Sequence, residues 1–144
     1  MSKPALSDII MELHVPDFGK AKDFYGKLGF EIVCEREPEG FKGYLVMKRG
    51  NSILCFWGGN EKIYDHTYFK RFDKTTKRGY GSEIVIFAEN IEKFFGEVSK
   101  FANVVEKLTL QPWGDKDFRV EDPFGYYLRF SSPYNTLYAE KAVK

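Results

Sequence analysis

A pattern of alternating residues close to the C-terminus constrains the fold most strongly. Between Pro112 and Phe130 the chain reads P-W-G-D-K-D-F-R-V-E-D-P-F-G-Y-Y-L-R-F. Phe118 and Val120 alternate with charged residues, at the period of a half-buried strand. The Asp-Pro-Phe-Gly run at 122–125 has the composition of a β-turn, because Pro presets φ and Gly accepts a positive φ. The stretch therefore predicts two antiparallel strands joined by a tight turn.

The rest of the chain predicts the same series of elements twice. Each half predicts a strand, a helix with one apolar face and three further strands, which is a βαβββ module. Asp17 and Asn90 are related by the same offset of 73 residues as Phe56 and Arg129. Asn90 is expected to cap the second helix. The expected strands are 9–15, 30–36, 43–48 and 52–57, then 83–88, 104–110, 117–121 and 126–131, and the expected helices are 18–28 and one beginning at Ile91.

Two motifs resemble one protein family. Residues 113–130 match W-G-x-x-x-F-x-V-x-D-P-x-G-x-x-L-x-F, which is similar to the C-terminal signature of the bleomycin-resistance branch of the vicinal oxygen chelate (glyoxalase/bleomycin resistance/dioxygenase) superfamily. Residues 13–17 followed by 21–30 resemble the strand, turn and helix that open such a module. The resemblance implies one α+β domain over residues 1–144, in which curled mixed sheets form a concave cleft. Its expected parts are module one (8–57), a linker (58–82), module two (83–131) and a tail (132–144).

Composition narrows the possible partners. The net charge of +1 gives no global attraction to nucleic acid or to an acidic membrane surface. No run approaches 18 apolar residues and no signal-peptide pattern is present, so no membrane partner is expected. The two cysteines, Cys34 and Cys55, predict reduced thiols in the cytosol. Fourteen Phe and nine Tyr exceed the needs of a small core, so some are expected in a pocket or a subunit contact.

The linker at 58–82 allows two interpretations. Glycines lie at both of its ends, and the segment is rich in cationic and aromatic residues. It is either a solvated linker or a basic and aromatic flap over a pocket. The aromatic residues of such a flap would be Tyr64, Tyr68, Phe69 and Phe72.

The metal-ligand positions of the superfamily are mostly lost in this sequence. By the resemblance, each module of the glyoxalase-like enzymes supplies one ligand from its first strand and one from its last, around a divalent metal. The corresponding positions hold Ile10, Phe56, Glu83 and Arg129. Only Glu83 can offer a lone pair to a metal. These departures imply no metal cofactor and favour a binding protein over an enzyme. The alternative is a displaced metal site formed by Glu12, His14 and Glu83.

Glu83 and Arg129 suggest an ion pair in place of the metal. If the fold brings the two positions together, a bidentate arginine–carboxylate pair would satisfy both charges. Arg129 would then also meet an anionic or carbonyl group of a ligand. The alternative is that its long side chain reaches solvent. The chain has no P-loop, dinucleotide-binding or nucleophile-elbow motif, and we expect no catalytic residue.

The resemblance implies a non-catalytic small-molecule binding protein. Resistance proteins of this branch form homodimers and sequester an antibiotic such as bleomycin in pockets that two subunits share. The expected ligand is therefore a bleomycin-like or other aromatic compound, bound in the cytoplasm by stacking and apolar burial. Two other classes stay open: a metal-dependent lyase or transferase, and a structural or regulatory binding module. The expected ligand-binding residues are Phe41, Tyr44, Trp57, Phe87, Trp113, Phe118, Tyr127 and Arg129.

Overall fold

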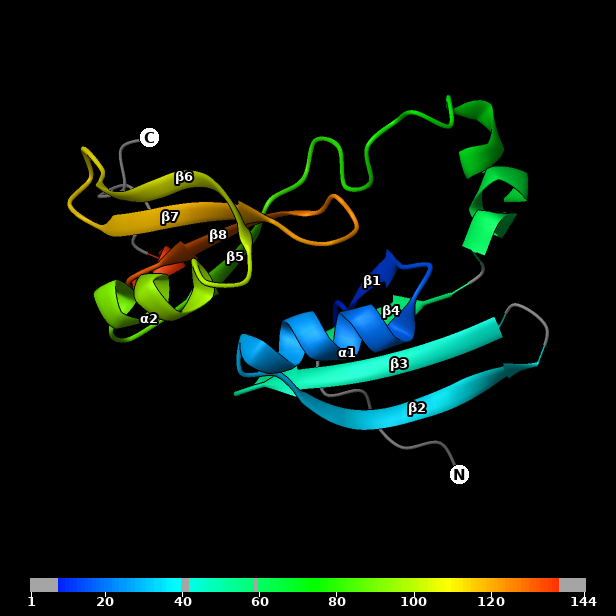
Figure 1. Cartoon of the computed structure of the whole chain (residues 1–144), viewed down its shortest axis with the longest axis horizontal. Helices are drawn as coiled ribbons and strands as arrows, with labels where there is room; N and C mark the ends of the chain where they lie inside the picture. The colour runs from blue at the N-terminus through cyan, green and yellow to red at the C-terminus, as the bar shows by residue number, and fades with distance from the viewer. Residues whose placement is uncertain (1–7, 40–41, 59, 138–144) are drawn as a thin grey trace. The chain divides into compact units, whose positions relative to one another are not determined.

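The chain divides into two compact units, each of which holds one βαβββ module (Figure 1). The computed structural model describes residues 8–39, 42–58 and 60–137. Unit 1 is Met1–Thr76 and unit 2 is Lys77–Lys144. The predicted α+β class and the predicted series of elements are confirmed. Phe41, a predicted ligand residue, lies outside the described residues.

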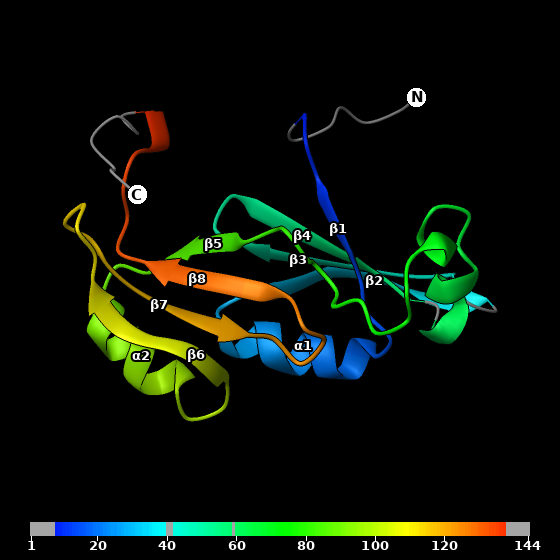
Figure 2. The same cartoon turned by 90° about the horizontal axis from the view of Figure 1, so that it is seen from above.

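Unit 1 is a four-stranded mixed sheet with one helix. Its sheet order is β1-β4-β3-β2, in which β1 runs parallel to β4 and the other pairs are antiparallel. Helix α1 lies against one face of this sheet (Figure 2). In chain order the elements are β1 (Met11–His14), α1 (Phe18–Lys27), β2 (Glu31–Glu39), β3 (Lys42–Arg49) and β4 (Ser52–Trp57).

The core of unit 1 lies between α1 and its sheet. Leu45 and Phe56 are fully buried, and the ring of Tyr25 from α1 lies 5.0 Å from that of Phe56. Helix α1 begins after Asp17, whose side chain accepts the backbone N–H of Lys20 at 3.0 Å. Because side chains alternate along a strand, the residues on either side of Leu45 and Phe56 point away from the helix. The sheet therefore has one core face and one open face.

Unit 2 repeats this arrangement. Its sheet order is β5-β8-β7-β6, with β5 parallel to β8 and the other pairs antiparallel. The order is the same as in unit 1 when each strand is matched to its counterpart in the other module. In chain order the elements are β5 (Ile84–Phe87), α2 (Ile91–Val98), β6 (Asn103–Leu110), β7 (Lys116–Glu121) and β8 (Tyr127–Ser131).

Aromatic rings form the core of unit 2 under α2. Phe118 and Phe130 are fully buried and stack with ring centroids 4.9 Å apart. Phe95 of α2 meets Phe118 edge-on at 5.0 Å. The helix begins after Asn90, whose side chain accepts the N–H of Lys93 at 3.3 Å, so the predicted cap is confirmed. As in unit 1, we call the face of the sheet that points away from the helix the open face, although Asp117, Arg129 and Ser131 on it are buried.

The predicted linker contains two short 3₁₀ helices, η1 (Asn60–Asp65) and η2 (Phe69–Arg71), which the sequence did not predict. His66 stabilises the start of η2, since its Nδ1 accepts the N–H groups of Tyr68 at 3.1 Å and of Phe69 at 3.4 Å. A side-chain acceptor at such a position satisfies N–H groups that have no partner within the helix.

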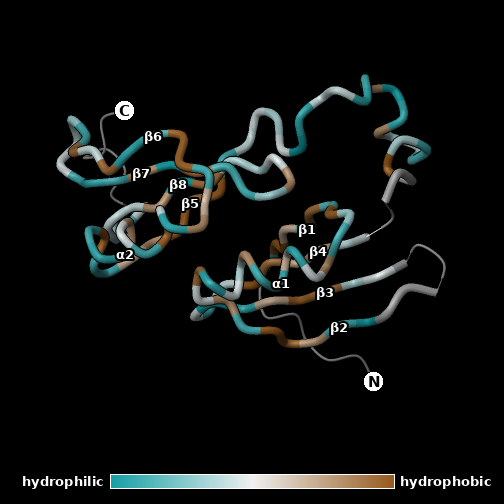
Figure 3. Tube along the Cα trace, viewed as in Figure 1, coloured by the Kyte–Doolittle hydropathy of each residue, from teal (hydrophilic) through white to brown (hydrophobic). Residues whose placement is uncertain are grey.

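Hydropathy separates the modules from the segment that follows β4 (Figure 3). Apolar residues gather in the strands and helices of each unit, whereas residues 60–80 are mostly hydrophilic or intermediate. Within the described part of the chain, no helix combines the length and the apolar character needed to cross a membrane.

Candidate ligand-binding site

The open face of unit 1 brings together several residues that the sequence singled out. His14, Trp57 and Tyr44 are register neighbours on β1, β4 and β3. The rings of His14 and Trp57 meet edge-on with centroids 4.7 Å apart. The Tyr44 hydroxyl donates a hydrogen bond to the carboxylate of Glu12. Two predicted ligand residues and two members of the alternative metal site therefore share this face.

Rings from the predicted flap continue outward from Trp57. The ring centroid of His66 lies 5.9 Å from that of Trp57. Phe69 stacks on Trp57, with ring centroids 6.4 Å apart and 26° between the ring planes. Tyr68 meets Phe69 at 5.2 Å and Phe72 at 5.5 Å. Tyr68, Phe69 and Phe72 expose 51%, 38% and 45% of their surface. We call these five residues the aromatic row. These contacts show that the rings of the segment touch one another and Trp57, while residues 65–77 are exposed. Both interpretations of the segment, as a solvated linker and as a flap over a pocket, stay predictions.

The phenol of Tyr44 is expected to make stability depend on pH. Burial raises its pKa, and the neighbouring Cys55 and Glu12 raise it further. As pH rises, the unfolded chain therefore loses this proton first, so the contribution of Tyr44 to stability is present below about pH 10 and is lost above it. Between about pH 8 and about pH 11, wild type should lose about 1 kcal/mol more unfolding free energy than Tyr44→Phe in urea titrations. Parallel pH curves for the two proteins would contradict this prediction.

The open face of unit 2 holds two guanidinium groups on neighbouring strands. Arg119 and Arg129 are register partners on β7 and β8. Arg129 is only 1% exposed, and its Nε lies 3.1 Å from Oε1 of Glu83. Its Nη1 donates to Oδ2 of Asp117 at 3.2 Å, and its Nη2 donates to the hydroxyl of Tyr134 at 3.1 Å. The structure therefore brings Glu83 and Arg129 together through one nitrogen, and not as the predicted bidentate pair, because Oε2 of Glu83 lies against Arg119. Each nitrogen of the Arg129 guanidinium has an acceptor.

Like charges directly opposite each other in a sheet repel and destabilise it. Here, carboxylates around the two arginines offset that repulsion. Arg119 Nε lies 3.5 Å from Oε2 of Glu83, and its Nη1 lies 2.9 Å from Oε2 of Glu106. The fully buried Asp117 accepts a further hydrogen bond from Nε2 of Gln111 at 2.7 Å. We call the two arginines and three carboxylates the arginine–carboxylate cluster. It carries one net negative charge.

Burial and charge act in opposite directions on the arginine pKa values. Burial alone lowers the pKa of Arg129, but hydrogen bonds with Tyr134 and Asp117 and the charge of Glu83 raise it, and the net shift is upward. The pKa of Arg119 is also raised, because nearby acidic groups outweigh the effect of burial. Both guanidiniums therefore stay charged and offer no lone pair to a metal.

The residues at the family's metal-ligand positions do not fit a metal. Ile10 is apolar and 55% exposed, Phe56 belongs to the core of unit 1, and Arg129 is a buried cation. Glu83, the one potential donor, is already bonded to two guanidiniums. No group of three or more His, Cys, Asp or Glu in the described residues is arranged to hold a metal ion. The alternative metal site, which stays a prediction, is divided between unit 1 (Glu12 and His14) and unit 2 (Glu83).

Phe118 must be corrected from a ligand residue to a core residue. It is fully buried and packs against α2 and Phe130. Phe118 pairs with Phe130 in the β7–β8 register, one position along from the pair of Arg119 and Arg129. Successive residues of a strand point to opposite faces, so Phe118 cannot share the open face with Arg129.

Three other predicted ligand residues of unit 2 are half-buried. Phe87 lies on the open face, where its ring meets that of Tyr134 edge-on at 4.9 Å. Tyr127 lies on the same face of β8 as Arg129, two residues earlier. Trp113 lies in the connection between β6 and β7 rather than on a strand. The structure therefore joins Phe87 to Arg129 through Tyr134, and the ligand-binding roles of these residues stay predictions.

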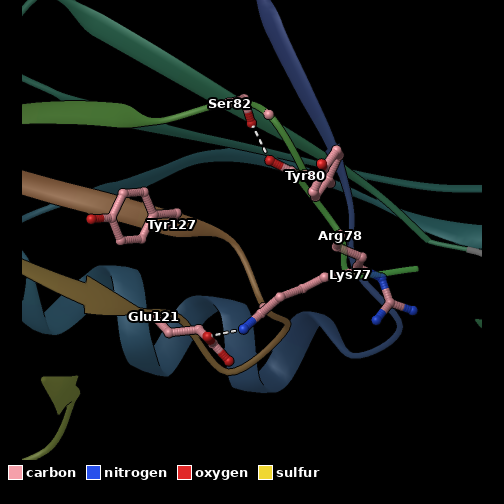
Figure 4. A pocket seen from close by; sticks show the side chains of 9 residues that line it. Lys77, Arg78, Tyr80, Ser82, Glu121 and Tyr127 are labelled. Carbon is pink, nitrogen blue, oxygen red and sulfur yellow. Dashed lines mark hydrogen bonds and ion pairs between the residues drawn. The ribbon is translucent and has the colours of Figure 1, made fainter. Parts of the chain in front are cut away.

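A pocket of about 240 Å³ lies beside Tyr127 in unit 2 (Figure 4). Figure 4 shows the ion pair of Lys77 with Glu121 along one side of it and the ring of Tyr127 along another. Gly79 has φ 73°, and a Cβ at this position would lie 2.6 Å from Cδ1 of Tyr126, so only glycine fits here. Burial raises the pKa of Tyr127 above its ordinary value. Neither Lys77 nor Glu121 was predicted from the sequence as a site residue.

Sequence reasoning missed four members of the site on unit 2. One signal was available, since charged residues at 117, 119 and 121 alternate with apolar Phe118 and Val120 and so share the open face. The local sequence gives no signal that Glu106 or Tyr134 contacts these residues, because the contact of Glu106 depends on strand register and that of Tyr134 depends on the path of the segment after β8. The missed members are Glu106, Asp117, Arg119 and Tyr134.

Residues 8–130 match the family model of the Glyoxalase/Bleomycin resistance protein/Dioxygenase superfamily. The chain therefore belongs to this superfamily, and the family resemblance found in the sequence is confirmed. A comparison with curated proteins finds no match.

Several solved structures share the fold. A superfamily member from Sphaerobacter thermophilus DSM 20745 is 17% identical, with 90% of this chain and 100% of that chain covered and a TM-score of 0.62. A bleomycin-binding protein complexed with bleomycin is 20% identical, with 89% and 99% covered and a TM-score of 0.57. A bleomycin resistance determinant encoded on the transposon Tn5 is 20% identical, with 90% and 99% covered and a TM-score of 0.59. At these identities the likeness concerns the fold.

Proposed function

We propose that the chain binds a small aromatic molecule and sequesters it without converting it, with a bleomycin-like antibiotic as the reference ligand. The observation that carries the proposal is the aromatic row. Its outer rings, Tyr68, Phe69 and Phe72, expose 38–51% of their surface while remaining in ring contact with one another and with Trp57. Exposed rings held in place by neighbouring rings can stack on a flat ligand at little entropic cost. The structural neighbour that contains bleomycin supports the choice of probe.

The arginine–carboxylate cluster supports the non-catalytic part of the proposal. Arg129 occupies a metal-ligand position of the family, and its three nitrogens are bonded to Glu83, Asp117 and Tyr134. An ion pair fixed in this way orients polar groups and leaves the carboxylates already paired. Binding by stacking requires neither a metal nor a general base.

The proposal includes a homodimer whose subunits share the ligand pocket. Strand β1 is an edge strand of its sheet. Its first residue, Met11, exposes 46% of its surface, and the two residues before it, Ile9 and Ile10, expose 84% and 55%. Adjacent exposed apolar residues on a sheet edge are a common feature of surfaces that another chain covers. Sedimentation equilibrium should give twice the mass of the chain, and a monomer at all concentrations would reject this part.

The test of the proposed function is a calorimetric titration of metal-stripped protein with bleomycin, beside titrations with Ni²⁺, Zn²⁺ and Mn²⁺. We expect drug binding near one molecule per subunit without added metal. Phe69→Ala should weaken that binding by about two- to tenfold, the usual value of one aromatic contact. Trp113→Ala should weaken it as well if the predicted role of Trp113 is correct.

A matched control is Leu110→Ala, which removes a large apolar side chain that is 64% exposed and lies outside the aromatic row and outside the pocket beside Tyr127. It should leave the affinity for bleomycin unchanged. Stoichiometric metal binding together with no drug binding would reject the proposal in favour of an enzyme. Equal losses in Phe69→Ala and Leu110→Ala would remove the aromatic row from the binding site.

A further inference from the structure

The side chain of Tyr134 fills a small site on the open face of unit 2. Its hydroxyl accepts a hydrogen bond from Nη2 of Arg129 at 3.1 Å. Its ring meets the ring of Phe87 edge-on, with centroids 4.9 Å apart and 72° between the planes. Phe87 is on β5 and Arg129 is on the neighbouring β8. Two adjacent strands therefore supply an aromatic wall and a charged donor to the same phenol.

Tyr134 reaches this site from the segment after β8. The N–H of Ser132 donates to the carbonyl of Lys116 at 3.2 Å, which holds the start of the segment beside β7. Beyond Tyr134, Asn135 and Leu137 are exposed, and the N–H of Leu137 bonds to the Asn135 side chain at 2.9 Å. Tyr134 itself is half-buried. It is thus the side chain by which this otherwise exposed stretch contacts the site.

The donor in this site is positioned by contacts that do not involve Tyr134. Nε of Arg129 bonds to Glu83 and Nη1 bonds to Asp117, so the plane of the guanidinium is fixed and Nη2 is directed at the phenol. A donor held in advance costs little to use in binding. A carboxylate or phenolate oxygen accepts from a guanidinium more strongly than a neutral phenol does. A ligand with such an oxygen on an aromatic ring could therefore compete with Tyr134.

We propose that Tyr134 occupies a subsite for an aromatic ring that carries an oxygen acceptor, the class of phenols and aryl carboxylates. Such a ring takes the place of Tyr134 against Phe87 and receives the hydrogen bond of Arg129. The inference rests on the proposed function where it names the class of ligand. The subsite itself is tested separately, because its contacts lie within unit 2 and do not include the aromatic row.

The test is chemical rescue of Tyr134→Ala with p-cresol, whose hydroxyphenyl ring has the atoms that the substitution removes. We expect p-cresol to bind Tyr134→Ala at least tenfold more tightly than wild type, where the tyrosine competes. Toluene, which lacks the oxygen, should bind the variant about tenfold more weakly than p-cresol, as expected for the loss of a hydrogen bond to a charged group. Benzoate tests the aryl carboxylates: it gains a stronger acceptor but meets the net negative charge of the arginine–carboxylate cluster, and it should still bind Tyr134→Ala more tightly than wild type. NMR shifts of the Phe87 ring would locate each probe.

Two further variants keep the test decisive. Tyr134→Phe keeps the ring and loses the acceptor, so it should admit p-cresol with a smaller gain than Tyr134→Ala. Leu110→Ala removes an exposed apolar side chain of the same unit, outside the pocket beside Tyr127, and should give no gain. Equal affinity of Tyr134→Ala for p-cresol and toluene would overturn the inference, as would equal binding of p-cresol to wild type and Tyr134→Ala.

Titration of the same proteins with bleomycin separates the two proposals. Binding of p-cresol to Tyr134→Ala without binding of bleomycin to either protein would support the subsite and reject sequestration of that drug. Binding of bleomycin to wild type without any gain for p-cresol in Tyr134→Ala would reject the subsite and leave the proposed function in place.

Discussion

Arg129→Met is expected to lower the free energy of unfolding by about 3–5 kcal/mol, the usual cost of breaking a buried ion pair from one side. The substitution keeps an unbranched side chain and removes the charge. Asp117, which is fully buried, loses the cation 3.2 Å away, and Glu83 loses the cation 3.1 Å away. Urea unfolding at neutral pH measures the loss, and an unchanged m-value would show that the unfolding transition exposes the same surface.

Arg119→Met is the matched control, because it removes the neighbouring guanidinium on the same face, whose side chain is 15% exposed. Its cost should be smaller than that of Arg129→Met, because its partners Glu83 and Glu106 are 26% and 43% exposed and can be solvated when the guanidinium is lost. In Arg129→Met the buried Asp117 keeps Nη1 of Arg119 at 3.6 Å as its one cationic partner among the described residues. The double variant Arg129→Met, Asp117→Asn removes this poorly compensated carboxylate and should recover part of the loss. Equal costs for Arg129→Met and Arg119→Met would show that burial of Arg129 does not set the strength of this pair.

The fold was predictable because local signals agree with each other in both modules. Alternating apolar residues mark the strands, and Asp17 and Asn90 mark the starts of the two helices, where both act as caps in the structure. These signals extend over a few residues and do not depend on distant parts of the chain. The short η1 and η2 helices were not predicted, since their residues carry no apolar period and the start of η2 is held by hydrogen bonds from the N–H groups of Tyr68 and Phe69 to His66.

The arginine–carboxylate cluster depends on long-range geometry. Glu83 is 46 residues from Arg129 along the chain, and Asp117 is 12 residues away. Glu106 lies opposite Arg119 between two register shifts in the β6–β7 pair. A shift of one residue moves a side chain to the other face of a sheet, and the sequence does not mark where such shifts occur. The position of Glu106 therefore could not be predicted, whereas the pair of Glu83 and Arg129 followed from the resemblance.

The face that Phe118 takes depends on the register of the β7–β8 hairpin. A four-residue turn with Asp122 and Gly125 as the closing pair would set Phe118 opposite Arg129, on the same face. In the structure the N–H of Asp122 instead bonds to the carbonyl of Tyr126, so Phe118 pairs with Phe130 and Arg119 pairs with Arg129. The Asp-Pro-Phe-Gly motif fits both registers, so it does not by itself predict the face of Phe118.

Phe118→Ala is expected to lower the free energy of unfolding by about 3–5 kcal/mol, as large-to-small changes in an aromatic core do. The ring of Phe118 lies within 4.9–5.0 Å of the rings of Phe130 and Phe95, so its removal leaves a cavity under α2. Phe118→Leu keeps most of the volume and should cost about 1 kcal/mol. Urea unfolding of both variants measures the difference, and ligand titration of Phe118→Leu measures any effect on binding.

The matched control for this position is Phe87→Ala on the open face. Phe87 is half-buried, so its loss removes less packing and should cost less than half as much stability as Phe118→Ala. The two sites should also differ in binding: Phe87→Ala should weaken the gain of p-cresol in the Tyr134→Ala background, and Phe118→Leu should leave that gain unchanged. If Phe118→Ala cost no more stability than Phe87→Ala, the division of this sheet into a core face and an open face would be wrong. The assignment of the ligand site to the open face would then fail with it, because that assignment depends on Phe118 and Arg129 pointing in opposite directions.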